Sequence, residues 1–222
     1  MVLGYLSGTS FIYDSPVNER FPRVGVIGAG QLARMMVAPA TALGIDLLLF
    51  AASPEDSGAQ ITHHVVGDYT DLDALKEFAS TCDVVTFEHE LVPLSVIKGL
   101  EAAGVKVYPP SSAFIYSQDK AQMREKLIKY PSPTWKIATS TADIERYPLI
   151  AKAISGGYDG RGVWKINSQD ELTEVLKTTP RLLIEELISF DSEIAVMVAR
   201  SPHGQATTCL LYTSPSPRDG LL

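Results

Sequence analysis

The segment RVGVIGAGQLARMMVAPATALGI, residues 23–45, decides how the first half of the chain folds. Its apolar, partly β-branched run at residues 24–27 predicts a buried parallel strand. The Gly-Ala-Gly sequence at residues 28–30 predicts a tight turn, and residues 31–43 predict a helix that Pro39 kinks or shortens. A turn that opens a helix offers backbone N–H groups and the positive end of the helix dipole to an anion. The segment therefore predicts the strand, turn and helix that begin an α/β sheet.

Strand and helix patterns continue to alternate after this segment. Further strand-like runs lie at residues 46–50, 64–68, 83–90 and 105–110, with helical patterns at 70–79 and 93–103. Regular alternation of this kind is typical of a doubly wound parallel sheet. We therefore expect residues 23–110 to form a Rossmann-like α/β domain, preceded by an irregular leader at residues 1–22.

The pattern changes to an α+β arrangement after Pro110. Strands are expected at residues 133–139, 148–154, 163–166, 181–188 and 192–200, and helices at 119–128 and after Ser168. The strands on either side of the glycine-rich segment 155–162 are expected to pair antiparallel. Residues 209–222 have no apolar period and no evident strand partner, so we interpret them as a non-native tail.

Composition limits the classes of function. The 222-residue chain carries a formal net charge of −7, which argues against nucleic-acid binding because such proteins present a basic face. Its two cysteines, Cys82 and Cys209, lack the spacing of a disulfide framework or a zinc site. No apolar run is long enough to span a membrane, and residues 1–22 lack the basic start and apolar block of a signal peptide. We therefore expect a cytoplasmic protein with neither nucleic acid nor membrane as partner.

The glycine turn leaves three interpretations open. Its Gly-x-Gly-x-x-Ala spacing at residues 28–33 is similar to a dinucleotide-binding turn, which also needs an acidic residue at the end of the second strand. That strand runs into Ala-Ala-Ser at residues 51–53, and Glu55 and Asp56 come later, inside a loop. The turn binds a dinucleotide, binds the phosphate of another ligand, or is a tight turn without a ligand.

The segment SGGYDGRG, residues 155–162, is either a hairpin turn or a flexible cover over a phosphate group. Its four glycines allow the backbone to approach a ligand closely. Lys152, at the end of the preceding strand, has the reach to contact phosphates as a point charge. A hairpin turn seldom needs tyrosine, aspartate and arginine between its glycines, so we favour the cover over the turn.

Acidic residues mark two further places. Glu88, His89 and Glu90 end a predicted buried strand, where ligands of α/β sheets bind, although a solvated loop with His89 as a cap is the alternative. Glu185 and Glu193 lie on apolar strands, where a carboxylate is costly unless it is hydrogen-bonded. A ribose would satisfy such a carboxylate, as would an edge position that faces water.

Five segments together carry a family resemblance. They are GAGQLARM (28–35), DVVTFEHELVP (83–93), QDKAQMREKL (118–127), GGYDGRGVW (156–164) and IEELISFDSEIAVMVARSPHGQ (184–205). In this order they resemble the ATP-grasp enzymes and, among them, the 5-(carboxyamino)imidazole ribonucleotide synthetase family. The resemblance implies a pre-ATP-grasp domain at residues 23–110 and the first α+β part of an ATP-grasp domain at 111–208.

The resemblance implies an ATP-dependent carbon–nitrogen ligase of purine (IMP) biosynthesis. ATP phosphorylates bicarbonate to carboxyphosphate, and the carboxyl group passes to the exocyclic amine of 5-aminoimidazole ribonucleotide, leaving 5-(carboxyamino)imidazole ribonucleotide, ADP and phosphate. A closing lid suits this chemistry because carboxyphosphate hydrolyses readily in water. The family further implies Mg²⁺ and a homodimer.

The same resemblance assigns site residues. For the ribonucleotide it implies that Gly30, Gln31 and Leu32 hold the 5′-phosphate and that Glu88 lines the imidazole pocket. The ATP-binding residues that it implies are Lys152, Gly157, Tyr158, Asp159, Gly160, Arg161, Gly162, Glu185, Glu186, Leu187, Ile188 and Glu193. Within this set, Tyr158 and Arg161 are the expected catalytic residues at the bicarbonate, residues 185–188 contact adenine, and Glu193 binds the ribose.

The chain departs from the family in two places. Ile115 stands where some members have a phosphate-contacting arginine. The family's last third, which holds its magnesium-binding acidic residues, does not follow residue 208, so we expect a C-terminally truncated chain without metal ligands, with exposed apolar surface and without activity of its own. Two alternatives stay open. One is another ATP-grasp ligase, such as a formate- or glycine-using purine enzyme or a biotin carboxylase. The other is an NAD-dependent oxidoreductase, an interpretation supported only by Gly28 and Gly30.

Overall fold

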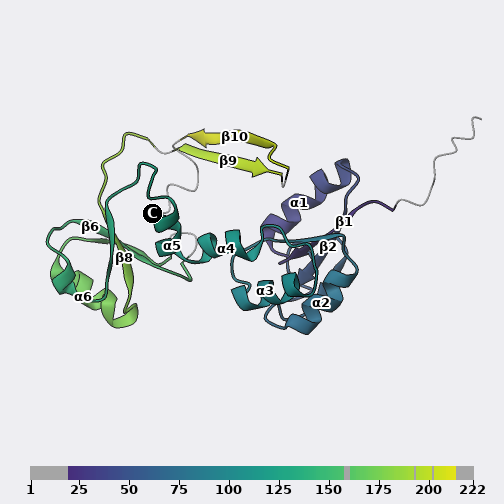
Figure 1. Cartoon of the computed structure of the whole chain (residues 1–222), viewed down its shortest axis with the longest axis horizontal. Helices are drawn as coiled ribbons and strands as arrows, with labels where there is room; N and C mark the ends of the chain where they lie inside the picture. Colours follow the sequence, from purple (N-terminus) through teal and green to yellow (C-terminus); the bar gives the residue numbers. More distant parts are fainter. Residues whose placement is uncertain (1–19, 158–160, 193, 202, 214–222) are drawn as a thin grey trace, which may run out of the picture. The chain divides into compact units, whose positions relative to one another are not determined.

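The computed structural model describes residues 20–157, 161–192, 194–201 and 203–213. The chain divides into two compact units, Met1–Ser112 and Ala113–Leu222 (Figure 1). The first is a parallel α/β unit and the second an antiparallel α+β unit, which together are the predicted fold class.

The first unit is built on a four-stranded parallel sheet with the order β3-β2-β1-β4. Its strands are β1 (Arg23–Ile27), β2 (Asp46–Ala51), β3 (His64–Val66) and β4 (Val84–Phe87). The central strand β1 pairs with β2 on one side and with β4 on the other. The strand order therefore reverses beside β1, and ligands of open α/β sheets bind at the carboxyl ends of the strands at such a point.

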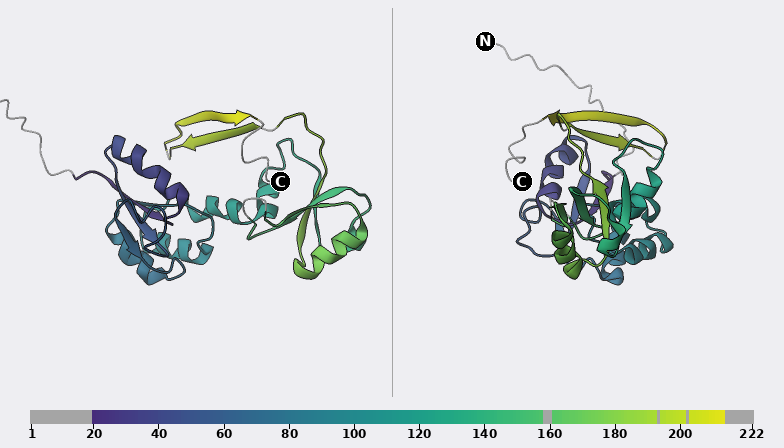
Figure 2. Two further views of the ribbon diagram at one scale, coloured as in Figure 1. Left: turned by 180° about the vertical axis from the view of Figure 1, so that it is seen from behind. Right: turned by 90° about the vertical axis from the view of Figure 1, so that its left-hand side faces the viewer.

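Helices cover both faces of this sheet (Figure 2). They are α1 (Gln31–Ala42), α2 (Leu72–Ser80) and α3 (Leu94–Ala102). On one face, Ala33 of α1 packs in a buried cluster with Val26 and Leu49. On the other, Phe78 of α2 meets Phe50 edge to face, with ring centroids 5.2 Å apart. The sheet is therefore doubly wound, as predicted.

One predicted strand of this unit is nearly absent. The run at residues 105–110 forms a single isolated parallel bridge, between Val107 and Val85 of β4. The run ends in two prolines, which have no N–H group to donate to a strand ladder. The helix α1, in contrast, continues through Pro39 and ends at Ala42, one residue short of its predicted end.

The second unit contains a four-stranded antiparallel sheet with the order β5-β8-β6-β7. Its elements are α4 (Ser111–Gln118), whose first two residues belong to the first unit, α5 (Lys120–Lys126), β5 (Trp135–Ala138), a 3-10 turn (Thr141–Asp143), β6 (Leu149–Ala153), β7 (Val163–Ile166), α6 (Gln169–Thr178) and β8 (Leu182–Glu186). On one face, Leu172 of α6 is buried with Ala151 and Leu182. On the other, Ala121 of α5 is buried with Leu183. The sheet therefore carries a helix on each face.

The helix predicted at residues 119–128 corresponds to α5, and the helix α4 before it was not predicted. The side chain of Asp119 separates the two, because it accepts a hydrogen bond from the N–H of Gln122 at 2.9 Å and so begins α5 as its N-cap. The predicted cap Ser168 has the same role at α6, where its hydroxyl accepts from the N–H of Glu171.

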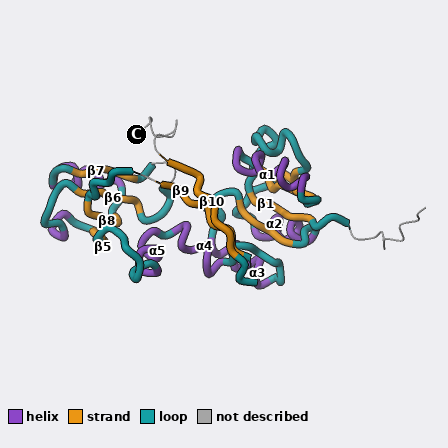
Figure 3. The backbone as a smooth tube through the Cα atoms, turned by 90° about the horizontal axis from the view of Figure 1, so that it is seen from above, coloured by secondary structure: helices purple, strands orange, loops and turns teal. Residues whose placement is uncertain are grey.

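The last two described strands form a sheet of their own (Figure 3). They are β9 (Ile194–Arg200) and β10 (Ala206–Thr213), which pair antiparallel. Residues 209–213 therefore have a strand partner, which corrects the prediction that the chain after residue 208 has none. Along β9 every side chain is exposed, including Ile194 at 67% and Met197 at 59%, on opposite faces of the strand. The predicted exposed apolar surface therefore lies on a two-stranded sheet, which is marginally stable by itself.

Candidate functional site

The first candidate site lies at the carboxyl ends of β1 and β4, where α1 begins. Gly28, directly after β1, has a φ of +113°, which residues with a side chain rarely adopt. Its N–H donates to the carbonyl of Phe50 at 2.9 Å, and the N–H of Glu88, directly after β4, donates to the carbonyl of Ile27 at 2.9 Å. These bonds fix the glycine turn and Glu88 side by side at the point where the strand order reverses.

The carboxylate of Glu88 binds the N-terminus of α1. It accepts hydrogen bonds from the N–H groups of Gly30 at 2.5 Å, Leu32 at 3.0 Å and Ala33 at 3.3 Å. The first turn of α1 contains no acidic residue, so Glu88 supplies from the next strand the negative charge that stabilises a helix N-terminus. A Cβ atom on Gly30 would lie 2.7 Å from Oε1 of Glu88, so a side chain at this position would force the carboxylate to shift.

The structure thus brings together three of the four residues that were expected at the ribonucleotide, Gly30, Leu32 and Glu88. The fourth, Gln31, lies in the first turn of α1, where its Oε1 accepts a hydrogen bond from the hydroxyl of Ser57 at 3.5 Å. Sequence reasoning did not anticipate that a carboxylate of the chain itself would bind the N–H groups that were expected to hold a phosphate.

Neighbouring polar residues bind within their own loops. The Nδ1 atom of His89 accepts a hydrogen bond from the N–H of Leu91 at 3.2 Å, so this ring closes a turn. The carboxylate of Asp56 accepts from the N–H groups of Ala52 at 3.0 Å and Ser53 at 3.1 Å. Asp56 is an acidic residue that a dinucleotide ribose would need, and its carboxylate is bound to the loop backbone instead. This geometry does not favour the NAD interpretation.

The second candidate site is a charged cluster on the face of the sheet that carries α5. Lys152 of β6 donates to Oε2 of Glu185 at 2.6 Å, and Nε of Arg124 of α5 donates to Oε1 at 2.6 Å. The side chain of Glu185 is 3% exposed, and those of Arg124 and Lys152 are 16% and 25% exposed. One carboxylate therefore faces two cations, and the three side chains carry an excess positive charge that suits a phosphate ligand.

Sequence reasoning identified Lys152 and Glu185 but missed Arg124. The sequence feature that could have identified Arg124 is its spacing from Lys120. The two cations stand four residues apart on α5 and therefore share one face of the helix. The N–H of Lys120 also donates to the carbonyl of Ile154, directly after β6, at 2.9 Å. This bond fixes the start of α5 beside the end of the strand that carries Lys152.

The glycine-rich segment 155–162 connects β6 to β7, which pair antiparallel as predicted. It is therefore the loop of a hairpin, which corrects the prediction that the segment is not a hairpin turn, whereas its role as a cover over phosphate groups stays a prediction. At its end, Gly162 has a φ of +74° and its carbonyl accepts from the N–H of Ala153 at 2.8 Å. The side chain of Lys120 reaches the loop and donates to the carbonyl of Gly157 at 3.4 Å.

Several expected ATP-binding residues lie outside the part of the chain that the structure describes. They are Tyr158, Asp159, Gly160 and Glu193, and their assignments stay predictions. Arg161 directly follows the first of these gaps, so its expected catalytic role also stays a prediction.

The expected adenine segment begins at Glu185 and continues past the end of β8. Glu186 is exposed, and its carboxylate accepts from the N–H of Thr134 at 2.8 Å. Leu187 and Ile188 are 39% and 44% exposed. Because alternate residues of a strand point to opposite faces, the carboxylates of Glu185 and Glu186 do not share one surface. Both residues also line a pocket of about 340 Å³ at this end of the sheet.

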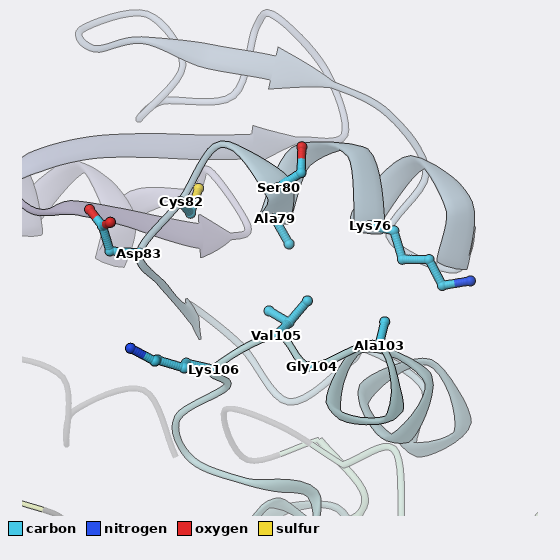
Figure 4. Close-up of a pocket in the computed structure, with 9 residues that line it drawn as sticks. All are labelled: Lys76, Ala79, Ser80, Cys82, Asp83, Ala103, Gly104, Val105 and Lys106. Atoms are coloured by element: carbon cyan, nitrogen blue, oxygen red, sulfur yellow. The ribbon is translucent and has the colours of Figure 1, made fainter.

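A pocket of about 390 Å³ lies in the first unit, at the amino end of β4 and so away from Glu88 (Figure 4). It is lined by Lys76, Ala79, Ser80, Cys82, Asp83, Ala103, Gly104, Val105 and Lys106. Burial raises the pKa of the Cys82 thiol, which donates to the carbonyl of Phe78 at 3.5 Å. A neutral, hydrogen-bonded thiol is a poor nucleophile, and none of the expected site residues lines this pocket.

Neither a metal cluster nor a membrane span occurs within the described ranges of residues 20–213. No group of three or more His, Cys, Asp or Glu side chains lies close enough together there to hold a metal ion. None of the helices in the same ranges is long and apolar enough to cross a bilayer.

Both halves of the chain match known domain families. The family model of the ribonucleotide synthetase preATP-grasp domain matches residues 21–118, and that of the ATP-grasp domain matches residues 122–220. The N5-carboxyaminoimidazole ribonucleotide synthase of Mycobacterium bovis is 37% identical over 88% of this chain and 52% of its own length. The chain spans about half the length of the curated relatives that it matches.

Solved structures agree with these matches. The carboxyaminoimidazole ribonucleotide synthase of Aspergillus clavatus complexed with ATP aligns with a TM-score of 0.74 and 31% identity, over 85% of this chain and 53% of that one. The enzyme from the same organism in complex with ADP and 5-aminoimidazole ribonucleotide aligns with a TM-score of 0.71 and 28% identity, over 85% and 52%. With both domain models matched and this similarity to the synthases along most of its length, the chain belongs to the N5-carboxyaminoimidazole ribonucleotide synthase family.

Proposed function

We propose that the protein of which this chain forms part carboxylates 5-aminoimidazole ribonucleotide with ATP and bicarbonate, in the synthesis of IMP. The observation that carries this proposal is that both halves of the chain match, in order, relatives and solved structures with that name. The reaction transfers the terminal phosphoryl group of ATP to bicarbonate. The carboxyphosphate that forms gives its carboxyl group to the exocyclic amine and releases phosphate.

The first unit is proposed to hold the ribonucleotide. The N–H groups of Gly30, Gln31 and Leu32 lie at the N-terminus of α1, where the helix dipole favours the 5′-phosphate. Glu88 lies against the same turn and is proposed to line the imidazole pocket. Since Glu88 binds two of these N–H groups in this structure, a phosphate that enters must replace its carboxylate there.

The second unit is proposed to hold ATP. Lys152 and Arg124 supply two cations for the phosphates, and their partial exposure leaves them accessible to a ligand. The loop with Gly157, Tyr158, Asp159, Gly160, Arg161 and Gly162 is proposed to cover the phosphates, with Tyr158 and Arg161 at the reacting carboxyl group. Residues 185–188 and Glu193 are proposed to contact adenine and ribose.

Other parts of the proposal rest on the family resemblance. They are the use of Mg²⁺, a cytoplasmic location and a homodimer. Magnesium would neutralise charge on the transferring phosphoryl group, and its ligands are expected in the family's last third. Because the chain spans about half the length of its relatives, it is proposed to need the rest of the protein for activity.

The proposal is tested by ADP formation with the full-length gene product. ADP should form only when ATP, bicarbonate and 5-aminoimidazole ribonucleotide are all present, and formate or glycine should not replace bicarbonate. ADP formation that depends on formate or glycine would assign the protein to another ATP-grasp ligase. Turnover by the 222-residue chain alone would contradict the proposed need for the last third.

A further inference from the structure

Glu185 is unusual among the charged residues of the second unit because it is buried. Its carboxylate is 3% exposed, and the only other polar residue buried within the described ranges is Ser111. A carboxylate removed from water is tolerated when it is paired and hydrogen-bonded. Here the two oxygens have separate partners, since Arg124 donates to Oε1 and Lys152 to Oε2, each at 2.6 Å.

The two partners of Glu185 come from different elements. Arg124 lies on α5 and Lys152 on β6, and Glu185 stands between them on β8, which pairs directly with β6. Two cations repel each other, and each side chain has several rotatable bonds. The carboxylate between them offsets that repulsion and fixes both cations in one place, at a distance set by its two oxygens.

The cations keep the capacity to bind a second anion. An ammonium group has three N–H donors and a guanidinium five, so one carboxylate does not saturate the pair. Both side chains remain partly exposed, whereas Glu185 does not. The exposed side of this cluster is therefore positive and rich in donors, and its acidic member is turned away from solvent.

We propose that Glu185 is a positioning residue that holds Lys152 and Arg124 together as a seat for the phosphate chain of a nucleotide. The inference rests on the proposed ATP site and assigns the Glu185 carboxylate to the two cations, while the segment 185–188 keeps its proposed contact with adenine. It predicts that loss of the Glu185 charge changes phosphate affinity in the direction opposite to that expected from charge alone. Removal of a negative charge near a phosphate should tighten anion binding by charge alone, whereas loss of a positioning group should weaken it.

The test measures binding of inorganic tripolyphosphate and of ADP to the 222-residue chain by calorimetry. Glu185→Gln, which keeps the size of the side chain and removes its charge, should weaken tripolyphosphate binding about tenfold or more, as expected when hydrogen bonds to charged groups are lost. The matched control is Glu174→Gln, because Glu174 accepts from Lys177 at the same 2.6 Å but both side chains are exposed. This control should bind tripolyphosphate as the unsubstituted chain does.

A second variant distinguishes the effect of the carboxylate's position from the effects of its charge and of unfolding. Glu185→Asp keeps the charge but is one methylene too short to reach both cations, so it should also weaken binding, although the charge is unchanged. The amide spectrum of β6 and β8 reports whether each variant keeps its sheet. Tighter or unchanged binding by Glu185→Gln, unchanged binding by Glu185→Asp, or loss of the sheet in both variants would each overturn the inference.

The two probes distinguish this inference from the proposed function. If tripolyphosphate binding follows the expected pattern but ADP does not bind, the positioning role stands and the nucleotide site of the proposed function fails. If the unsubstituted chain binds neither probe, the positioning role is overturned as well.

Discussion

Replacement of Glu88 by alanine should loosen the first turn of α1. The variant removes a carboxylate that accepts three N–H groups of that turn, at 2.5, 3.0 and 3.3 Å. Loss of a capping side chain costs about 0.5–2 kcal/mol, and loss of a negative charge at a helix N-terminus costs about 0.3–1 kcal/mol. We therefore expect Glu88→Ala to lower the free energy of opening of α1 by about 2 kcal/mol, and Glu88→Gln by about half as much, because an amide oxygen still accepts hydrogen bonds.

Hydrogen exchange of the peptides that cover α1 measures this effect directly. A loss of about 2 kcal/mol corresponds to exchange that is roughly 30-fold faster. Trp135 and Trp164 both lie in the second unit, so tryptophan fluorescence during unfolding should be unchanged and reports that unit as an internal control. The matched substitution is Glu77→Ala, at an exposed glutamate of α2. Equal exchange of α1 in the Glu88 and Glu77 variants would refute the reasoning.

Three further outcomes are expected. Iodoacetamide should modify exposed Cys209 faster than Cys82 at about pH 8, because burial raises the pKa of the Cys82 thiol; equal rates by mass spectrometry would contradict this. Backbone N–H groups lower the pKa of Asp143, so its carboxylate stabilises the fold above its unfolded pKa of 3.8 and this contribution is lost as the pH falls through the lower folded value. The difference in Tm between the unsubstituted chain and Asp143→Asn should therefore shrink below about pH 4, and a constant difference would speak against it. Glu88→Ala should bind ribose 5-phosphate more tightly than the unsubstituted chain in a calorimetric titration, because the N–H groups of α1 lose their internal competitor; weaker binding would show that Glu88 does not compete.

The local elements of both units could be predicted from the sequence. Residues 23–45 combine an apolar run, a glycine turn and a helical pattern in the order that β1 and α1 then show. One prediction that failed involves a partner from elsewhere in the chain. Residues 209–213 have no apolar period of their own, yet they pair with β9, because backbone groups form a strand ladder whatever the side chains are.

The site was predictable only in part, for the same reason. The contact of Glu88 with Gly30 spans 58 residues, and that of Arg124 with Glu185 spans 61. No periodicity within one segment encodes such contacts, since they depend on which strands become neighbours. Lys152 and Glu185 could each be identified from their chemistry, whereas the ion pair between them could be identified only from the fold.

Glu88 and Glu185 show how the same side chain can have opposite effects on a phosphate ligand. Glu88 binds neutral N–H donors whose number is limited, and a phosphate needs the same donors, so its carboxylate competes with the ligand. Glu185 binds two cations that together keep a net positive charge, and it is buried behind them, so its carboxylate organises the donors without using all of them. Removal of the carboxylate should therefore favour phosphate binding in the first unit and oppose it in the second. A purely electrostatic effect would have the same sign at both positions, so the pair of variants separates competition from positioning within one chain.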